Sequence, residues 1–259
     1  QEPPSEIPEI IADFDVVLLH TSHSLTHTAA GQAIRTHARG ASLPGVTADI
    51  LNHTMNVIYE PIAKRGEGLA MIVRSAQHMR ITSEYGTDII TEIRPDGVFN
   101  DDGIYTEPGS YGNLPAGEVF FAPLPRSTEG TWVINARMAD HELDEDIILE
   151  IQHGAVKHIR GGDAADQLRA TLEAIGDAAF EVAEIGIGTH STARPDAPVI
   201  ESEKALGTAH LAVGNSAVIG GDNDVPIHLD GITLHPTIEV DHALIMREGE
   251  FEIAAGFGV

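Results

Sequence analysis

The hydrophobic pattern of this chain changes near residue 80, and that change constrains the fold more than any other feature. Before it, apolar β-branched runs alternate with alanine-rich segments that have helical spacing, and Thr47 can cap one of these helices. Alternating strands and helices favour a parallel sheet covered by helices. The elements expected here are strands at 15–20 and 41–43 and helices at 28–39, 47–51 and 59–77.

After residue 80, short β-type runs punctuated by glycine replace this alternation. A hairpin is expected around His153-Gly154, and Asp163 is expected to cap a single helix over 164–175. We therefore predict an α/β domain over residues 1–85 and an α+β, β-rich domain over residues 86–259. The strands expected in the second domain are 88–93, 118–121, 131–136, 147–152, 155–159, 180–187, 209–213, 227–234, 237–240 and 243–247, with 79–82 at the boundary.

The charge balance excludes several classes of partner. Forty acidic and fifteen basic residues give a formal charge of −25, which repels nucleic acid and anionic lipid. No apolar run reaches the roughly 18 residues of a membrane helix, so we expect a soluble, cytoplasmic protein. Only three of the basic residues are lysines. We interpret this composition as adaptation to high salt, and an acidic protein of ordinary habitat is the alternative.

The absence of cysteine limits the chemistry, because it removes disulfides, thiolate metal sites and cysteine nucleophiles. Fourteen histidines remain, and imidazole with carboxylate is the ligand set left for a divalent transition metal. The sharpest local pattern is His228-Leu-Asp230, since residues i and i+2 of a strand share a face and can reach one ion. Two outward polar residues on a half-exposed strand are the alternative interpretation.

Three further polar residues lie in apolar segments where burial is expected. Glu118 follows Gly117, Glu184 lies between Ala183 and Ile185, and His210 lies in a glycine-bounded strand. A buried carboxylate or imidazole costs several kcal/mol unless it is paired or binds a metal. These residues are therefore candidate metal ligands, although a core histidine bonded to a carbonyl group would also explain His210.

Four motifs that contain these candidate ligands follow one another along the chain. The motifs are Asn113-Leu-Pro-Ala-Gly-Glu118-Val-Phe-Phe-Ala-Pro, Ala183-Glu184-Ile-Gly-Ile-Gly-Thr189, Glu203-Lys-Ala-Leu-Gly-Thr-Ala-His210 and Ile227-His228-Leu-Asp230-Gly. In sequence and in order they resemble the thermophilic aminopeptidase T family of metallopeptidases. Upstream segments around His27, Leu43 and Gly86 resemble the first domain of that family, so the resemblance covers nearly the whole chain.

The resemblance implies a two-domain fold, a homodimer and a dinuclear centre. The implied ligands are Glu118, Glu184, His210, His228 and Asp230. The family usually begins with another strand-helix unit before the region that starts at Pro3, and this unit is absent here. Because the first residue is Gln1 and not Met, we expect the chain to be processed or incomplete.

A metal-dependent hydrolase is the first functional expectation. Two Zn, Co or Mn ions per chain would activate a water molecule to remove N-terminal residues from small peptides. Glu118 is the expected bridging ligand, and Glu184 or Glu203 is expected to be a ligand or the general base. The chain supplies more carboxylates than one ion requires, and this surplus favours the hydrolase. A protein that keeps only the scaffold, without catalysis, is a third possibility.

A ring-cleaving dioxygenase is the alternative. No tyrosine follows His210 closely, unlike in the peptidases of the family, and the same superfamily contains 2,5-dihydroxypyridine 5,6-dioxygenase. That resemblance implies one Fe(II) on His210, His228 and Asp230, with Glu118 and His27 orienting an ionisable aromatic substrate. His27 lies at the end of the first expected strand, where open α/β sheets gather ligand contacts, and an ordinary helix cap is its alternative role.

Overall fold

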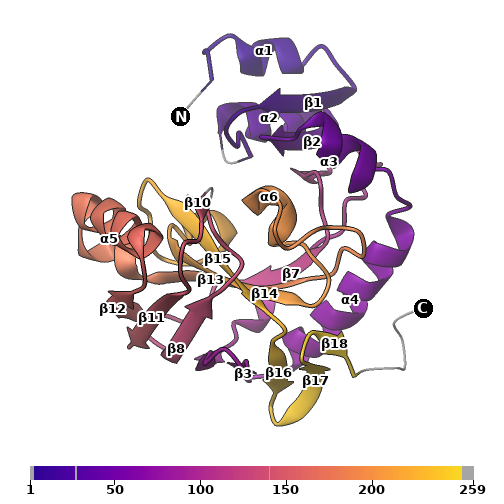
Figure 1. Ribbon diagram of the computed structural model, residues 1–259. Helices are drawn as coiled ribbons and strands as arrows, with labels where there is room; N and C mark the ends of the chain where they lie inside the picture. The colour runs from indigo at the N-terminus through magenta and orange to yellow at the C-terminus, as the bar shows by residue number, and fades with distance from the viewer. Residues whose placement is uncertain (1–2, 27, 140, 253–259) are drawn as a thin grey trace.

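The computed structural model describes residues 3–26, 28–139 and 141–252, which form three sheets with helices around them (Figure 1). Strands β1 (Val16–Thr21), β2 (Arg39–Pro44) and β6 (Tyr111–Asn113) pair in parallel. Helices α1 (Ile7–Ile11) and α2 (Ala29–His37) pack on this sheet through buried residues such as Ile34. The predicted parallel N-terminal sheet is confirmed, and its third strand comes from a segment that the sequence pattern did not reveal.

The other two sheets are built almost wholly of antiparallel pairs. Their strand orders are β10-β9-β15-β14-β13-β7-β5 and β12-β11-β8-β4-β3-β16-β17-β18. The first contains β5 (Val98–Asp101), β7 (Glu118–Phe121), β9 (Arg137–Met138), β10 (His141–Glu142), β13 (Val182–Gly188), β14 (Thr208–Gly214) and β15 (His228–Leu234). The second contains β3 (His78–Thr82), β4 (Asp88–Glu92), β8 (Glu129–Ile134), β11 (Ile147–Gln152), β12 (Ala155–Arg160), β16 (Thr237–Val240), β17 (Ala243–Arg247) and β18 (Glu250–Phe251).

One hydrophobic core joins these two sheets to two long helices, α4 (Glu60–Ser75) and α5 (Asp163–Ile175). Trp132 on β8 is fully buried in it, and its indole nitrogen donates to the Gly231 carbonyl on β15 at 3.2 Å. The seven-stranded sheet buries apolar side chains of one face in this core, so its opposite face can carry polar side chains.

A smaller hydrophobic core joins the N-terminal sheet to a short helix near residue 200. Helices α3 (Ala48–His53) and α6 (Val199–Ser202) meet in it, because Ile50 and Ile200 pack with Leu43 and Val46. Figure 1 shows α6 between the N-terminal elements and the large sheets. The chain that leaves α6 therefore starts between the N-terminal elements and the large sheets. Short 3₁₀ turns complete the fold at Pro95–Gly97, Asp177–Phe180 and Ala217–Ile219.

Most expected elements are present, with differences at their ends. The hairpin at His153-Gly154 is confirmed, since both residues have positive φ between the paired strands β11 and β12. Thr47 caps α3 by accepting from the amide of Ile50 at 3.3 Å. The expected cap by Asp163 is wrong: Asp163 is the first residue of α5, and a distant carboxylate, Asp144, accepts from its amide at 2.8 Å.

The mixed α/β class is confirmed, whereas the division into domains at residue 85 stays a prediction. Residue 85 lies in the turn that joins β3 to the adjacent strand β4 of one sheet. Within the described residues, no helix combines the length and hydrophobicity needed to cross a bilayer. The expected homodimer and cytoplasmic location also stay predictions.

Candidate metal centre

Neighbouring strands of the seven-stranded sheet present polar side chains on one face. Side chains alternate along a strand, so Val119, Ile185 and Leu211 enter the core while their neighbours point to the other side. Cross-strand register aligns these neighbours, for example Glu118 with Asp101 and with Gly188. The resulting polar face carries Asp101 on β5, Glu118 on β7, Glu184 on β13, His210 on β14, and His228 and Asp230 on β15.

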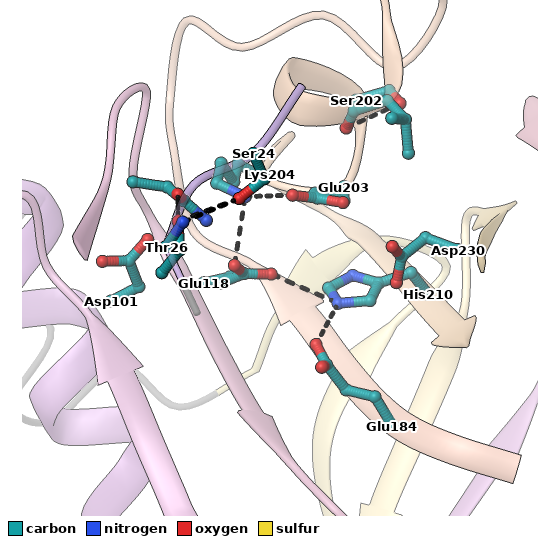
Figure 2. A network of polar contacts seen from close by, with 12 residues as sticks. Ser24, Thr26, Asp101, Glu118, Glu184, Ser202, Glu203, Lys204, His210 and Asp230 are labelled. Carbon is teal, nitrogen blue, oxygen red and sulfur yellow. Dashed lines mark hydrogen bonds and ion pairs between the residues drawn. The ribbon is translucent and has the colours of Figure 1, made fainter. Parts of the chain in front are cut away.

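The side chains on this face converge in two groups that share Glu184. In the first, Nε2 of His210 lies 3.2 Å from Glu118 Oε2 and 3.2 Å from Glu184 Oε1 (Figure 2). In the second, Nε2 of His228 lies 3.4 Å from Glu184 Oε2 and 3.6 Å from Asp230 Oδ1. The ligand atoms within each group all lie within 4.8 Å of one another, close enough for one ion. Five predicted ligands from four separate segments are therefore brought together.

The donor set fits a divalent metal ion. His228 Nδ1 lies 2.7 Å from the Asn215 carbonyl oxygen, which can only accept, so Nδ1 donates to it and Nε2 is the nitrogen that faces the carboxylates. At His210, one ring nitrogen faces two carboxylate oxygens but can offer only one proton. A cation among these atoms satisfies all of them at once.

A buried lysine provides a positive charge beside this centre. Lys204 lies two residues after the end of α6 and is fully buried. Its Nζ donates to Glu118 Oε1 at 3.0 Å and to Glu203 Oε1 at short range (Figure 2). Glu118 thus contacts Lys204 with one oxygen and His210 with the other. Lys204 is a residue that the sequence reasoning missed, although its place beside Glu203 in an apolar stretch was a usable signal.

These contacts shift the pKa values of the carboxyl groups in opposite directions. Burial alone would raise the pKa of Glu118, but the Lys204 ammonium and the His210 imidazole hold it below its ordinary value. Burial raises the pKa of Glu203 to about 8, helped by the charges of Asp230 and Glu118 and opposed by Lys204. Burial also raises the pKa of Asp101 to about 7. The cluster therefore combines an ionised carboxylate with two carboxyl groups that can exchange protons near neutral pH.

Two glycines make this packing possible, and the sequence analysis had assigned them no role. A Cβ atom on Gly186 would lie 2.0 Å from Nε2 of His210, which crosses over the neighbouring strand at that point. A Cβ atom on Gly188 would lie 2.0 Å from the Ala205 carbonyl oxygen, so Gly188 lets the Lys204 loop approach β13. Both glycines therefore allow neighbouring segments to approach β13 closely in the site.

The segment before α2 also reaches this region. Ser24 Oγ donates to Thr26 Oγ1 at 3.0 Å, and Thr26 Oγ1 donates to Asn113 Oδ1 at 2.7 Å, in the segment that leads to Glu118. His27, which was predicted to be functional, lies outside the described residues, so its role stays a prediction.

The convergent donor set is that of a candidate metal centre, and comparison with known proteins specifies the family. The NicX family model, described as 2,5-dihydroxypyridine 5,6-dioxygenase, matches residues 9–253. The chain belongs to this family.

Individual relatives agree with this assignment. A 2,5-dihydroxypyridine 5,6-dioxygenase of Pseudomonas putida KT2440 is 25% identical over 195 residues, which cover 69% of this chain and 55% of the relative. The chain thus spans little more than half the length of that curated relative. The solved 2,5-dihydroxypyridine dioxygenase of the same organism has a TM-score of 0.79 at 21% identity, covering 96% of this chain and 75% of that one.

The predicted relationship to aminopeptidase T holds at the level of the fold. Wild-type AmpT from Thermus thermophilus has a TM-score of 0.67 at 15% identity, covering 96% of this chain and 79% of that one. The fold is similar to that of AmpT, but the family is that of the dioxygenase.

The primary functional expectation, a metalloaminopeptidase-like hydrolase, is wrong, because the family match and the curated relative both point to the dioxygenase alternative. The expected pair of Zn, Co or Mn ions is likewise not supported. The structure explains the error: the surplus carboxylates that favoured a second ion, Glu118 and Glu203, already contact the Lys204 ammonium.

Proposed function

We propose that this chain is an Fe(II)-dependent dioxygenase that opens the ring of a hydroxylated pyridine, with 2,5-dihydroxypyridine as the first substrate to test. Family membership supports this reaction. The observation that carries the proposal is the convergence of two imidazoles and a carboxylate from β14 and β15 around Glu184. Because the chain spans 55% of its curated relative, the activity of the whole protein is part of the proposal.

His210, His228 and Asp230 would hold the iron. Two histidines and one carboxylate are the ligand set of non-haem Fe(II) oxygenases, and this set leaves positions open for other ligands. Bound there, Fe(II) supplies the one-electron chemistry that dioxygen needs to react with an aromatic ring. Glu184 contacts both imidazoles and so fixes their relative placement. It would act as a further metal ligand or as the general base that the sequence predicts.

The neighbouring carboxyl groups would handle the substrate hydroxyls. Glu118, ionised beside Lys204, can accept a hydrogen bond from a ring hydroxyl and orient the ring. Burial raises the pKa of Glu203 to about 8, and in its ionised form Glu203 can take up the hydroxyl proton. The two roles differ because Glu118 contacts His210 as well as Lys204, whereas Glu203 contacts Lys204 and lies near the charges of Asp230 and Glu118.

Oxygen consumption tests the proposal. The purified chain, freed of metal and loaded anaerobically with Fe(II), should consume one dioxygen per 2,5-dihydroxypyridine while the ring absorbance disappears. His228→Ala and Asp230→Asn should each lower the turnover number at least about 100-fold and weaken iron binding. His158→Ala, which alters an exposed histidine on β12, is the matched control and should leave both unchanged.

Two outcomes would contradict the proposal. One is release of amino acids from small peptides by the metal-loaded chain without oxygen uptake. The other is iron binding that persists unchanged in both His228→Ala and Asp230→Asn, because the cluster on β15 would then not be the metal centre.

A further inference from the structure

Lys204 differs from the other charged groups of the cluster because it is a cation with no access to solvent. A buried ammonium costs several kcal/mol unless carboxylates surround it, and Glu118 and Glu203 both contact it. Each offers one oxygen to Nζ, as it could to a metal ion. Asp101 lies close enough for its charge to act on the same group.

The backbone of Lys204 is held as firmly as its side chain. The Lys204 carbonyl accepts from the amide of His190 at 2.8 Å, and Ala205 forms a bridge with His190. Gly188 allows this loop to lie directly on β13. Ile200, on the helix that precedes Lys204, packs in the small core beneath the N-terminal sheet. The ammonium is therefore a fixed part of the centre.

Glu118 links the ammonium to the predicted metal position. One of its oxygens contacts Lys204, and the other lies 3.2 Å from the proposed ligand His210. In this arrangement Glu118 bridges two positive positions, one of which is the ammonium. The bridging role predicted for Glu118 is thus possible, but between a metal ion and a lysine.

The charges around Nζ agree with this geometry. Glu118 and Glu203 offer Nζ at most two negative charges. A divalent ion could therefore replace the ammonium between these two oxygens without leaving unbalanced charge. An ion bound there in addition to the ammonium would place two cations against the same two oxygens.

We propose that Lys204 limits this centre to one metal ion per chain, because its ammonium group occupies the position in which Glu118 and Glu203 would otherwise hold a second divalent ion. The inference rests on the proposed metal centre but not on the identity of the reaction. Lys204 is therefore a positioning residue, and its effect is measured as the number of metal ions bound per chain.

The experiment counts bound Mn²⁺, a redox-stable probe, in metal-free full chain. After equilibration with Mn²⁺ and desalting, elemental analysis should give one ion per chain for the unaltered protein and two for Lys204→Met. Electron paramagnetic resonance should show a spin-coupled Mn²⁺ pair only in Lys204→Met. The double variant Lys204→Met/Glu203→Gln, which also removes a carboxylate, should return to one ion. Lys157→Met, altered at an exposed lysine, should bind one ion.

A count of one in folded Lys204→Met would overturn the proposal, as would a count of two in the unaltered protein. Circular dichroism with and without Mn²⁺ tests whether Lys204→Met folds only in the presence of metal. Failure to fold even in millimolar Mn²⁺ would also contradict the proposal, because the second ion should replace the missing charge. A chain that binds one ion but cleaves no ring would refute the proposed function and leave this inference standing.

Discussion

The imidazole of His210 on β14 lies over Gly186 of the paired strand β13, and a methyl group on Gly186 would come within 2.0 Å of Nε2. We predict that Gly186→Ala forces the ring away from Glu118 and Glu184, because the colliding atoms belong to a fully buried ring. The expected result is metal affinity about 10- to 100-fold weaker. Isothermal titration with Mn²⁺ measures it.

The matched control for this substitution is Gly97→Ala. A Cβ atom on Gly97 would meet only the Arg94 side chain, at 3.5 Å, an ordinary contact distance. Gly97→Ala should therefore bind Mn²⁺ as the unaltered protein does. Equal affinity of the two variants would show that the ring position over Gly186 has no bearing on metal binding.

Glu201 should anchor the loop that carries Lys204. Its buried carboxylate accepts from Thr54 Oγ1 at 2.7 Å and from Arg194 Nε at 2.9 Å, and Arg194 also contacts Asp49 on α3. We predict that Glu201→Gln lowers the free energy of unfolding by about 2 kcal/mol, the usual scale for hydrogen bonds to a charged group. Urea unfolding followed by circular dichroism measures this.

An exposed ion pair provides the comparison for Glu201. Glu67 contacts Arg74 at 3.2 Å, and both side chains are well exposed, so Glu67→Gln should change stability by less than about 0.5 kcal/mol. The pKa of Glu201 is lowered because Arg194 and Thr54 outweigh the effect of burial. The stability that Glu201 contributes should therefore be lost as pH falls through its folded-state pKa, below its ordinary value of 4.5.

His190 should make the free energy of unfolding depend on pH in a higher range than Glu201 does. Its ring is buried against Tyr59, and burial lowers its pKa to about 4. Between about pH 6.5 and 4, the unfolded chain takes up a proton that the folded chain refuses, so the free energy of unfolding should fall as pH falls. The contribution amounts to about 3 kcal/mol across this window.

Comparison with His190→Asn isolates this effect, because Asn can still accept from the amide of Thr192 as Nδ1 does. The stability difference between the two proteins should narrow steadily from pH 7.5 to pH 4. In His158→Asn, which alters an exposed ring, the difference should stay constant. A constant difference for His190→Asn would mean that the pKa of the His190 ring is the same in the folded and the unfolded protein.

The charge of −25 should make stability depend on salt. Raising KCl from 0.1 M to 1 M shortens the Debye length from about 10 Å to about 3 Å, which weakens repulsion among surface carboxylates. We predict a rise in Tm over this range, measured by calorimetry on the metal-free chain. A Tm that falls or stays level would contradict adaptation to high salt.

Local pattern was enough to locate most strands and the long helices. The β-branched run before Thr21 and the spacing in 163–175 leave few alternatives, because a buried face repeats with the period of its element. Elements whose stability comes from distant partners escaped prediction. Strand β6 exists because β2 pairs with it, and the cap of α5 comes from Asp144, which is nineteen residues away.

The sequence by itself determined which groups could bind a metal, since Glu118, Glu184 and His210 are polar residues in apolar segments, and His228 and Asp230 share one face of a strand. It could not determine how their charges are balanced. Only the tertiary structure placed the Lys204 ammonium between Glu118 and Glu203 and the His210 ring over Gly186. The physical reason is that electrostatic and steric contacts act through space, between strands whose pairing no local pattern encodes.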